Sequence, residues 1–270
     1  METDKNTNIE EPRKQVSGKR VIAAIVIALF AGGYLFLSLL APSTKIDSIK
    51  NEYAYKKPEK GGINDTLLTD SSFIALYRQK AFLQARITMA ATDSAALSLD
   101  MTDSTARVEI KGVTVFSSRM SSIRISRVFT GCDQYAITSL LSKPFTIKNS
   151  IASIPKEPVV HKVAPRDTSE YKPYEVPDTS RKEYVNIILE TENGFRLYIY
   201  QETGGNMPAR MHRFAFDLAD RLRNAGYILR CMFTFSRPDY KPYIKITLPA
   251  KEAKAIYRAI PAKGEFAVRI

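Results

Sequence analysis

The sequence predicts an α+β protein in which an N-terminal transmembrane helix is followed by two small, mostly antiparallel α+β lobes. Three observations support this prediction. A run of 21 residues without a charge, residues 21–41, lies near the start of the chain. Two later regions alternate apolar and polar residues as β-strands do. A proline-rich stretch, residues 151–180, separates those two regions.

The uncharged run is long enough to cross a membrane as a helix. At about 1.5 Å per residue it extends roughly 32 Å, close to a hydrocarbon core of about 30 Å. Lys19 and Arg20 bound it on one side and Pro42 on the other. A secretory signal has an apolar stretch of only about 7–15 residues before a small-residue cleavage site. Since "LLA" before Pro42 is a poor cleavage site, we expect an uncleaved anchor rather than a signal peptide or a buried helix.

The charges beside the run indicate its orientation. Residues 11–20 carry four positive charges and residues 42–51 carry two. Positive charge close to a span holds that end in the cytoplasm. We therefore expect residues 1–20 to be a cytoplasmic tail and the C-terminal domain to be periplasmic. The chain is then a single-pass protein of the inner (cell) membrane, held there by residues 21–41.

Residues 42–66 are polar, rich in lysine and end near a glycine pair, a composition typical of a stalk. The first lobe, residues 67–150, begins with a helix that Thr69 or Asp70 can cap. Its apolar face is expected to contain Phe73, Leu76, Tyr77, Leu83 and Ile87.

Three alternating segments follow in the first lobe: "SAALSLDM", "ARVEIKGVTVFSS" and "SSIRISRVF". They predict an antiparallel meander with a bulge or bend at Gly112. A short helix ending before Pro144 completes the lobe. Prolines at 155, 158, 165, 173 and 177 then fix the backbone, so residues 151–180 form an extended linker or arm and mark the lobe boundary.

The second lobe, residues 181–270, opens with a hairpin in which Asn193-Gly194 suits a type I′ turn. An amphipathic helix then ends before Gly226, and strands in "YILRCMFTFS" and "YIKITLP" follow it. A helix, "AKEAKAIYRAI", and a strand, "EFAVRI", complete the lobe. The amphipathic helix has Met211, Phe214, Ala215, Leu218 and Leu222 on one side and Arg210, Arg213, Asp217, Asp220, Arg221 and Asn224 on the other.

The sequence contains no recognisable catalytic constellation. His161 and His212 are the two histidines, and neither stands beside a nucleophile motif. Ser153 and Lys156 have Ser-x-x-Lys spacing, but prolines prevent the helix that would bring them together. Glu190 and Glu192 are expected to be solvated residues on one strand face. We therefore predict no enzyme, and no catalytic, cofactor-binding or metal-binding residue.

Cys132 and Cys231 leave two alternatives open, a disulfide or two separate buried thiols. The net charge of +12 either favours anionic partners or serves solubility. Aromatic and basic residues alternate on several predicted strands, as they do in some nucleic-acid-binding sheets. Acidic residues interrupt that pattern on the helix, and the expected location lies outside the cytoplasm, so we do not expect nucleic acid as a partner.

Several segments resemble a group of uncharacterised single-pass envelope proteins of Bacteroidota. They are "DSAALSLDMTDSTARVEIKGVTV", "LSKPFTI" and "IPKEPVVHKVAPRDTSE", within residues 65–200. The resemblance implies a bacterial inner-membrane anchor with a periplasmic domain. The ending "AKAIYRAIPAKGEFAVRI" and the strands after Ser94 are similar in style to L,D-transpeptidases. The catalytic motif of that family is absent, since Cys132 stands in "TGCD" without the histidine.

Together these features predict a membrane-anchored, non-enzymatic structural or assembly protein of the bacterial cell envelope. Its expected partners are other envelope proteins in an inner-membrane complex, such as a secretion or conjugation apparatus. The alternative is a peptidoglycan-binding or wall-modifying protein related to inactive L,D-transpeptidases.

Overall fold

The computed structural model describes residues 18–54, 70–156 and 183–270. Within these residues the chain is an α+β protein with a long apolar helix near its N-terminus, as the sequence predicts. The prediction of two separate lobes is wrong, because the strands join into a single mixed sheet.

Nine strands of the described residues form this sheet in the order β3-β2-β1-β9-β5-β6-β7-β8-β4. The pairs β1–β9 and β7–β8 are parallel, and the other neighbours are antiparallel. The strands are β1 (Ala96–Asp100), β2 (Thr105–Ile110), β3 (Val113–Arg119), β4 (Ser122–Ile125), β5 (Phe145–Ala152), β6 (Asn186–Thr191), β7 (Arg196–Gln201), β8 (Tyr243–Leu248) and β9 (Glu265–Arg269).

Two long-range pairings merge the predicted lobes. The last strand, β9, lies between β1 and β5, where Phe266 stands opposite both Leu97 and Phe145. Strand β4 leaves the predicted meander and pairs with β8 at the far edge, with Ile123 opposite Ile246. Strands β5 and β6 flank the proline-rich stretch and also pair with each other. That stretch is therefore no lobe boundary, and residues 157–180 of it lie outside the described residues.

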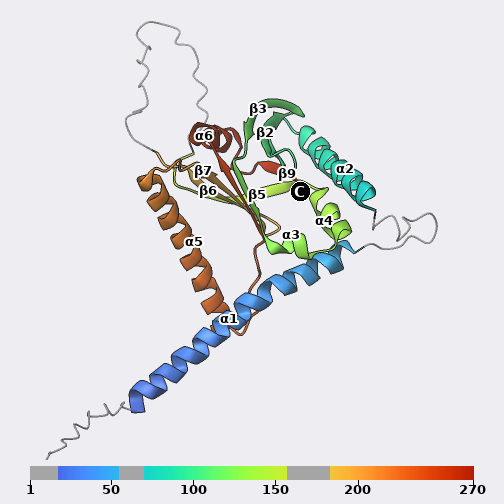
Figure 1. Ribbon diagram of the computed structural model, residues 1–270. Coiled ribbons are helices and arrows are strands. Elements are labelled where there is room, and N and C mark those ends of the chain that lie inside the picture. Colours follow the sequence, from blue (N-terminus) through green and yellow to red (C-terminus); the bar gives the residue numbers. More distant parts are fainter. Residues whose placement is uncertain (1–17, 55–69, 157–182) are drawn as a thin grey trace, which may run out of the picture.

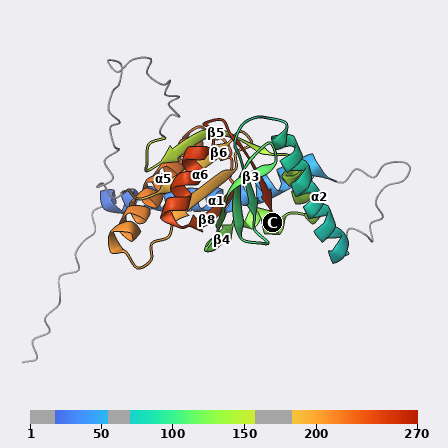
Figure 2. The same cartoon turned by 90° about the horizontal axis from the view of Figure 1, so that it is seen from above.

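Helices cover both faces of the sheet. Figure 1 shows the strands between α2 and α5, with α6 above them and α1 below, and Figure 2 shows the same arrangement from above. The helices are α1 (Gly18–Tyr53), α2 (Ser71–Ala90), α3 (Arg127–Gly131), α4 (Gln134–Leu141), α5 (Met207–Phe233) and α6 (Ala250–Ala259).

The main hydrophobic core lies on one face of the sheet, under α3, α4, α6 and the C-terminal part of α1. Alternate residues of the strands point into it, because successive strand side chains face opposite sides. Leu97, Leu197, Ile199 and Ile246 are almost fully buried there. The opposite face has two smaller apolar clusters, one under α2 and one under α5.

Helix α2 begins where the sequence predicts, since Asp70 caps it by accepting a hydrogen bond from the Ser72 amide at 2.9 Å. The predicted apolar face is wrong, however. Leu76, Leu83 and Ile87 are exposed, and the helix instead buries a different face. That face contains Ala81, Phe82, Ala85 and Met89.

Helix α1 continues through Pro42 to Tyr53 instead of ending before the proline. The described part of the predicted stalk, residues 42–54, is therefore mostly helical. It also packs on the domain, because Ile49 is 3% exposed and belongs to the main core. Lys45 adds an ion pair with Asp239 at 3.3 Å.

Helix α5 is longer than predicted. Gly226 does not end it, and the segment predicted as a strand, "YILRCMF", forms its last two turns. Gly194 adopts a left-handed φ of 79° at the β6–β7 hairpin, but Asn193 does not, so the turn is not type I′. Gly112 likewise lies in a tight turn between β2 and β3, and the bulge falls at Val108 and Glu109.

Candidate functional site

Helix α5 turns its polar side toward the sheet. An amphipathic helix on a soluble domain ordinarily faces its apolar stripe to the core. Here Asp217, Asp220 and Asn224 contact the sheet, because the face of β7 below them carries Arg196, Tyr198 and Tyr200 rather than aliphatic residues. The polar residues on the strand recur every second position and those on the helix every three or four, so the two rows match in register.

A buried charge cluster forms the centre of this contact. Tyr198 donates a hydrogen bond to Asp220 at 2.8 Å, and Arg196 lies 3.4 Å from the same carboxylate. Arg196 also pairs with Glu190 at 2.5 Å and donates to Asn224 at 3.0 Å. Burial alone raises the pKa of Glu190, but Arg196 and Lys241 outweigh it, and the net shift of that pKa is downward. These pairings show that the cluster is a structural joint between β7 and α5.

A second cluster surrounds Lys245 on β8. Its ammonium group lies 4.4 Å from the Tyr198 ring and also over the Tyr200 and Tyr243 rings. Burial lowers the pKa of Lys245 from its ordinary value. Tyr200 donates a hydrogen bond of 2.6 Å to Asp217, and the Arg213 guanidinium lies 4.0 Å above the Tyr200 ring. Burial, reinforced by Asp217, raises the pKa of Tyr200 strongly, so this tyrosine stays protonated.

A cationic cleft opens beside these two clusters. Its volume is about 310 Å³. Arg124, Arg213 and Lys245 line it from three different elements, and Glu202 is the single acid in the lining. None of the three cations forms an ion pair with another described residue. The rest of the lining consists of hydroxyl groups and backbone: Ser121, Ser122, Thr203, Gly204 and Thr247.

The composition of the cleft suits binding of an anionic group. Three cations and several hydroxyls offer donors to a carboxylate or phosphate. The cleft lies at the Leu248 end of β8, whereas the loop before the Tyr243 end contacts α1 through Asp239. It therefore opens at the end of the sheet that lies away from α1.

The outward side of α5 is apolar and exposed. Its residues follow one another at steps of three, four or seven along the helix, so they form a continuous stripe, called here the α5 stripe. These residues are Met207, Met211, Phe214, Leu218, Leu222, Leu229 and Phe233. The stripe meets α1 at its C-terminal end: the Phe233 and Phe30 rings lie 5.7 Å apart, and Met232 reaches Gly33.

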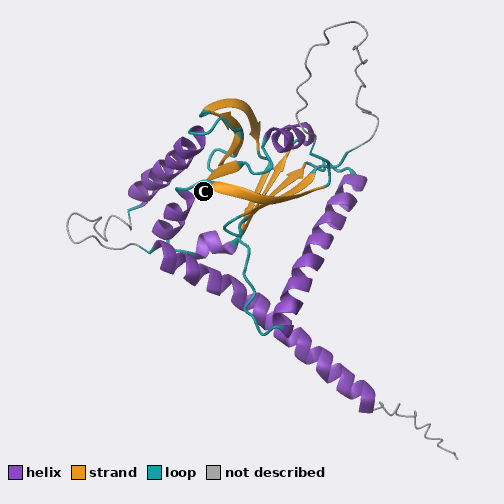
Figure 3. Ribbon diagram, turned by 180° about the vertical axis from the view of Figure 1, so that it is seen from behind, coloured by secondary structure: helices purple, strands orange, loops and turns teal. Residues whose placement is uncertain are grey.

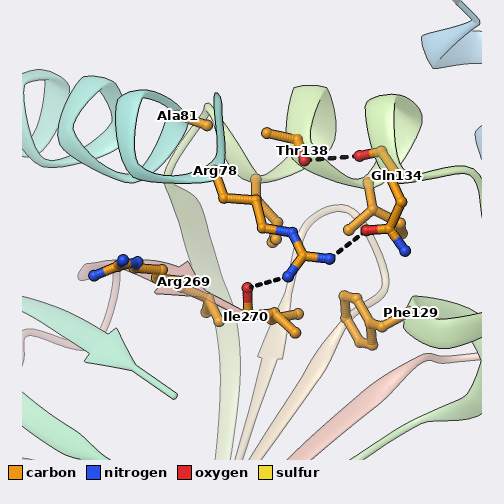
Figure 4. Close-up of a pocket in the computed structure, with 10 residues that line it drawn as sticks. Arg78, Ala81, Phe129, Gln134, Thr138, Arg269 and Ile270 are labelled. Atoms are coloured by element: carbon orange, nitrogen blue, oxygen red, sulfur yellow. Dashed lines mark hydrogen bonds between the residues drawn. The ribbon is translucent and has the colours of Figure 1, made fainter. Parts of the chain in front are cut away.

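A second, much smaller cavity lies between α2, α4 and β9 (Figure 4). Its volume of about 20 Å³ has room for roughly one water molecule. Arg78 closes it by donating to the Ile270 carbonyl oxygen at 3.2 Å and to the Gln134 side chain. The arginine is thus used in joining α2 to α4 and β9, and the cavity is part of the packing.

The residues considered for catalysis do not come together. His212 lies on α5 with Nδ1 3.0 Å from the Asn186 amide nitrogen, and its ring packs near Tyr184. His161 lies outside the described residues. Ser153 is hydrogen-bonded to the backbone of residues 184 and 186, while the Lys156 ammonium lies 4.9 Å from the Tyr257 ring.

The remaining candidates have structural roles. Glu190 belongs to the charge cluster, and Asp217 and Asp220 accept hydrogen bonds from Tyr200 and Tyr198. Cys132 and Cys231 are free and buried rather than bridged. Across the described ranges, no group of three or more His, Cys, Asp or Glu side chains is arranged to hold a metal.

Sequence reasoning missed the cationic cleft, because its three cations come from three distant segments. A signal was nevertheless present in "RLYIYQ" and "YIKITL", where Arg196, Tyr198, Tyr200 and Lys245 occupy one side of two strands. Such a side requires polar partners, and the polar face of α5 supplies them.

The fold and the site define a class of protein: an α+β domain joined to one N-terminal helix that is long and apolar enough to cross a membrane, as an anchor or as a signal sequence. No family model, no curated protein and no solved structure matches this chain.

Proposed function

We propose that this chain is a membrane-anchored, non-enzymatic structural or assembly protein of the bacterial cell envelope. In this proposal α1 stays in the inner membrane as a single span. Residues 1–20 lie in the cytoplasm and the sheet domain lies in the periplasm. The domain belongs to a complex of inner-membrane proteins, such as a secretion or conjugation apparatus, and acts by binding its partners.

One observation carries the proposal: the domain contacts α1 on both sides of Pro42. Upstream of it, Phe30 and Gly33 contact Phe233 and Met232 of α5. Downstream of it, the helix buries Ile49 in the main core. Cleavage near Pro42 would remove the upstream contacts and expose more of α5, so this architecture favours retention of the helix.

Fractionation of the native protein tests the anchor. We expect the chain to stay in the membrane fraction after alkaline carbonate extraction, with residues 21–41 still present by mass spectrometry. A C-terminal alkaline phosphatase fusion should be active. A soluble mature protein with a new N-terminus near Pro42 would contradict the membrane anchor. An inactive fusion would contradict the proposed orientation and would place the sheet domain in the cytoplasm.

The cationic cleft is the part of the site expected to bind an acidic group of a partner. Charge reversal at Arg124 and Lys245 should abolish in-cell crosslinks between the full-length protein and its complex. Reversal of exposed Lys251 on α6 provides a matched control. If crosslinks survive in the cleft variant, the partner contact lies elsewhere. Binding to purified, protein-free peptidoglycan would instead favour the wall-binding alternative.

A further inference from the structure

We propose that the α5 stripe docks on the lipid bilayer that holds α1, with α5 sloping so that its C-terminal end lies deepest. This inference rests on the proposed function, because it needs α1 in a membrane. The bilayer would cover the α5 stripe, which otherwise exposes seven large apolar side chains to water.

Continuity with the anchor is the first argument. Phe30 and Gly33 lie near the middle of the apolar run 21–41. Since Phe233 packs against Phe30 and Met232 reaches Gly33, a bilayer that contains this run also reaches the end of α5. Figures 1 and 3 show α5 on the side of the domain from which the N-terminal half of α1 projects.

The distribution of charge on α5 is the second argument. Both acidic residues of the helix, Asp217 and Asp220, face the sheet and are hydrogen-bonded there. The exposed charged residues are all basic: Arg210, Arg221, Arg223 and Arg230. A helix with an apolar stripe flanked by arginines is the pattern that binds an anionic lipid surface.

The number of charged residues also falls toward the C-terminal end of α5, which is the end proposed to lie deepest in the bilayer. Residues 207–225 contain four arginines, a histidine and both acids, which suits the headgroup region. Residues 226–233 contain one charged residue, Arg230, whose long side chain can reach back toward the headgroups. Tyr227 is exposed between the two parts, where tyrosine is favoured at membrane interfaces. Phe235, just after the helix, is almost fully exposed and extends the apolar end.

The chain contains no tryptophan, so single tryptophan variants of the full-length protein report depth directly. Phe214→Trp, Leu222→Trp and Leu229→Trp place the reporter on the α5 stripe. Ile27→Trp reports the anchor. Val113→Trp on the distant edge strand β3 is the control, because Val113 is about as exposed as Ile27 and Leu222. Each variant is reconstituted in vesicles of phosphatidylcholine and phosphatidylglycerol whose acyl chains carry bromine at defined depths.

We expect bromolipid quenching at positions 27, 214, 222 and 229, and none at 113. The depth should increase from position 214 to position 229, and the N-terminal part of the stripe should lie on the order of 5–10 Å below the headgroup boundary. Quenching at 27 without quenching at 222 and 229 would overturn the docking of α5 and leave the anchor intact. Absence of quenching at 27 would overturn the anchor and the docking with it.

A charge test separates the lipid from a protein partner. Arg210→Glu combined with Arg221→Glu should weaken the docked state by about fivefold per arginine in vesicles with phosphatidylglycerol. Arg119→Glu on β3 is the control for charge alone. Unchanged quenching at Leu222→Trp in the double variant would contradict the role of the arginines. Crosslinking of Leu222→Cys to a second copy, with no lipid quenching at 222, would replace the bilayer with a protein partner.

Discussion

The hydroxyl group of Tyr198 lies 2.8 Å from Oδ2 of Asp220, and both side chains are buried between β7 and α5. This contact explains why α5 shows its apolar side to the surroundings. Asp220 is hydrogen-bonded to Tyr198 and paired with Arg196. A rotation of α5 that turned its leucines toward the sheet would break these contacts and leave the buried Tyr198 and Arg196 without this partner.

Removal of the Asp220 carboxylate should be strongly destabilising. Asp220→Ala leaves Arg196 and Tyr198 buried with fewer partners, a change expected to cost about 3 kcal/mol of unfolding free energy. Chemical denaturation of the detergent-solubilised protein, followed by circular dichroism, measures it. Asp103→Ala is the control, since Asp103 is exposed, and should change stability by less than about 0.5 kcal/mol. Equal effects of the two variants would contradict the structural role of the cluster.

Polar substitution on the α5 stripe should leave the fold intact. Leu222 is 64% exposed, so Leu222→Gln is expected to change the unfolding free energy by less than about 0.5 kcal/mol in detergent. Leu197, which is buried in the main core, is the contrast, and Leu197→Ala should cost about 2–5 kcal/mol. A large loss of stability in Leu222→Gln would mean that α5 packs with its apolar side inward.

The second half of α1 should contribute to domain stability. Ile49→Ala removes a side chain from the main core and should cost about 2–4 kcal/mol. Leu39→Ala, on the exposed part of the same helix, should have little effect on unfolding. If Ile49→Ala is silent as well, residues 42–53 do not support the domain and belong to the stalk that the sequence predicts over residues 42–66.

Acid should weaken the Glu190 pairings. Arg196 and Lys241 hold the pKa of this carboxyl below its ordinary value of about 4.3, so its stabilisation is present above that value and is lost as the pH falls through the lower, folded-state pKa. Glu190→Gln should therefore be less stable than the wild type at neutral pH, with a gap that closes in acid. Unfolding free energies measured across the acidic range test this, and a gap that stays constant with pH would refute it.

Lys245 should react with acylating reagents at a lower pH than an ordinary lysine. Burial lowers its pKa from the usual value of about 10.4, which increases the neutral, nucleophilic fraction. Asp217 acts in the opposite direction, so Asp217→Asn should move the reactivity profile to still lower pH. Mass spectrometry of the modified peptide over a pH series gives the profile. A profile matching that of a free lysine peptide would contradict the shift.

Local signals in the sequence predict much of the secondary structure. Asp70 predicts the start of α2, Gly194 predicts the β6–β7 hairpin, and the proline at 144 marks the end of α4. These features depend on a few neighbouring residues, which is why they can be read from the sequence alone.

The long-range pairings could not be predicted in the same way. Strand β9 is apolar enough to pair with several strands, and nothing in "EFAVRI" specifies β1 and β5 as its neighbours. The orientation of helix α5 depends on Tyr198 and Tyr200 of β7 and on Lys245 of β8, which are distant from α5 in the sequence or lie on another element. The cationic cleft depends on the long-range strand pairing and on the orientation of α5, because its cations come from β4, β8 and α5.

The position of β9 also sets the order in which the protein matures. Strands β1 and β5 are synthesised long before β9, so the two parts of the sheet cannot be joined until the last strand has been made. The apolar helix α1 leaves the ribosome well before either half. In the anchored state proposed above, α1 is therefore available to the membrane before the sheet closes, and the facing edges of β1 and β5 stay unpaired until β9 is synthesised.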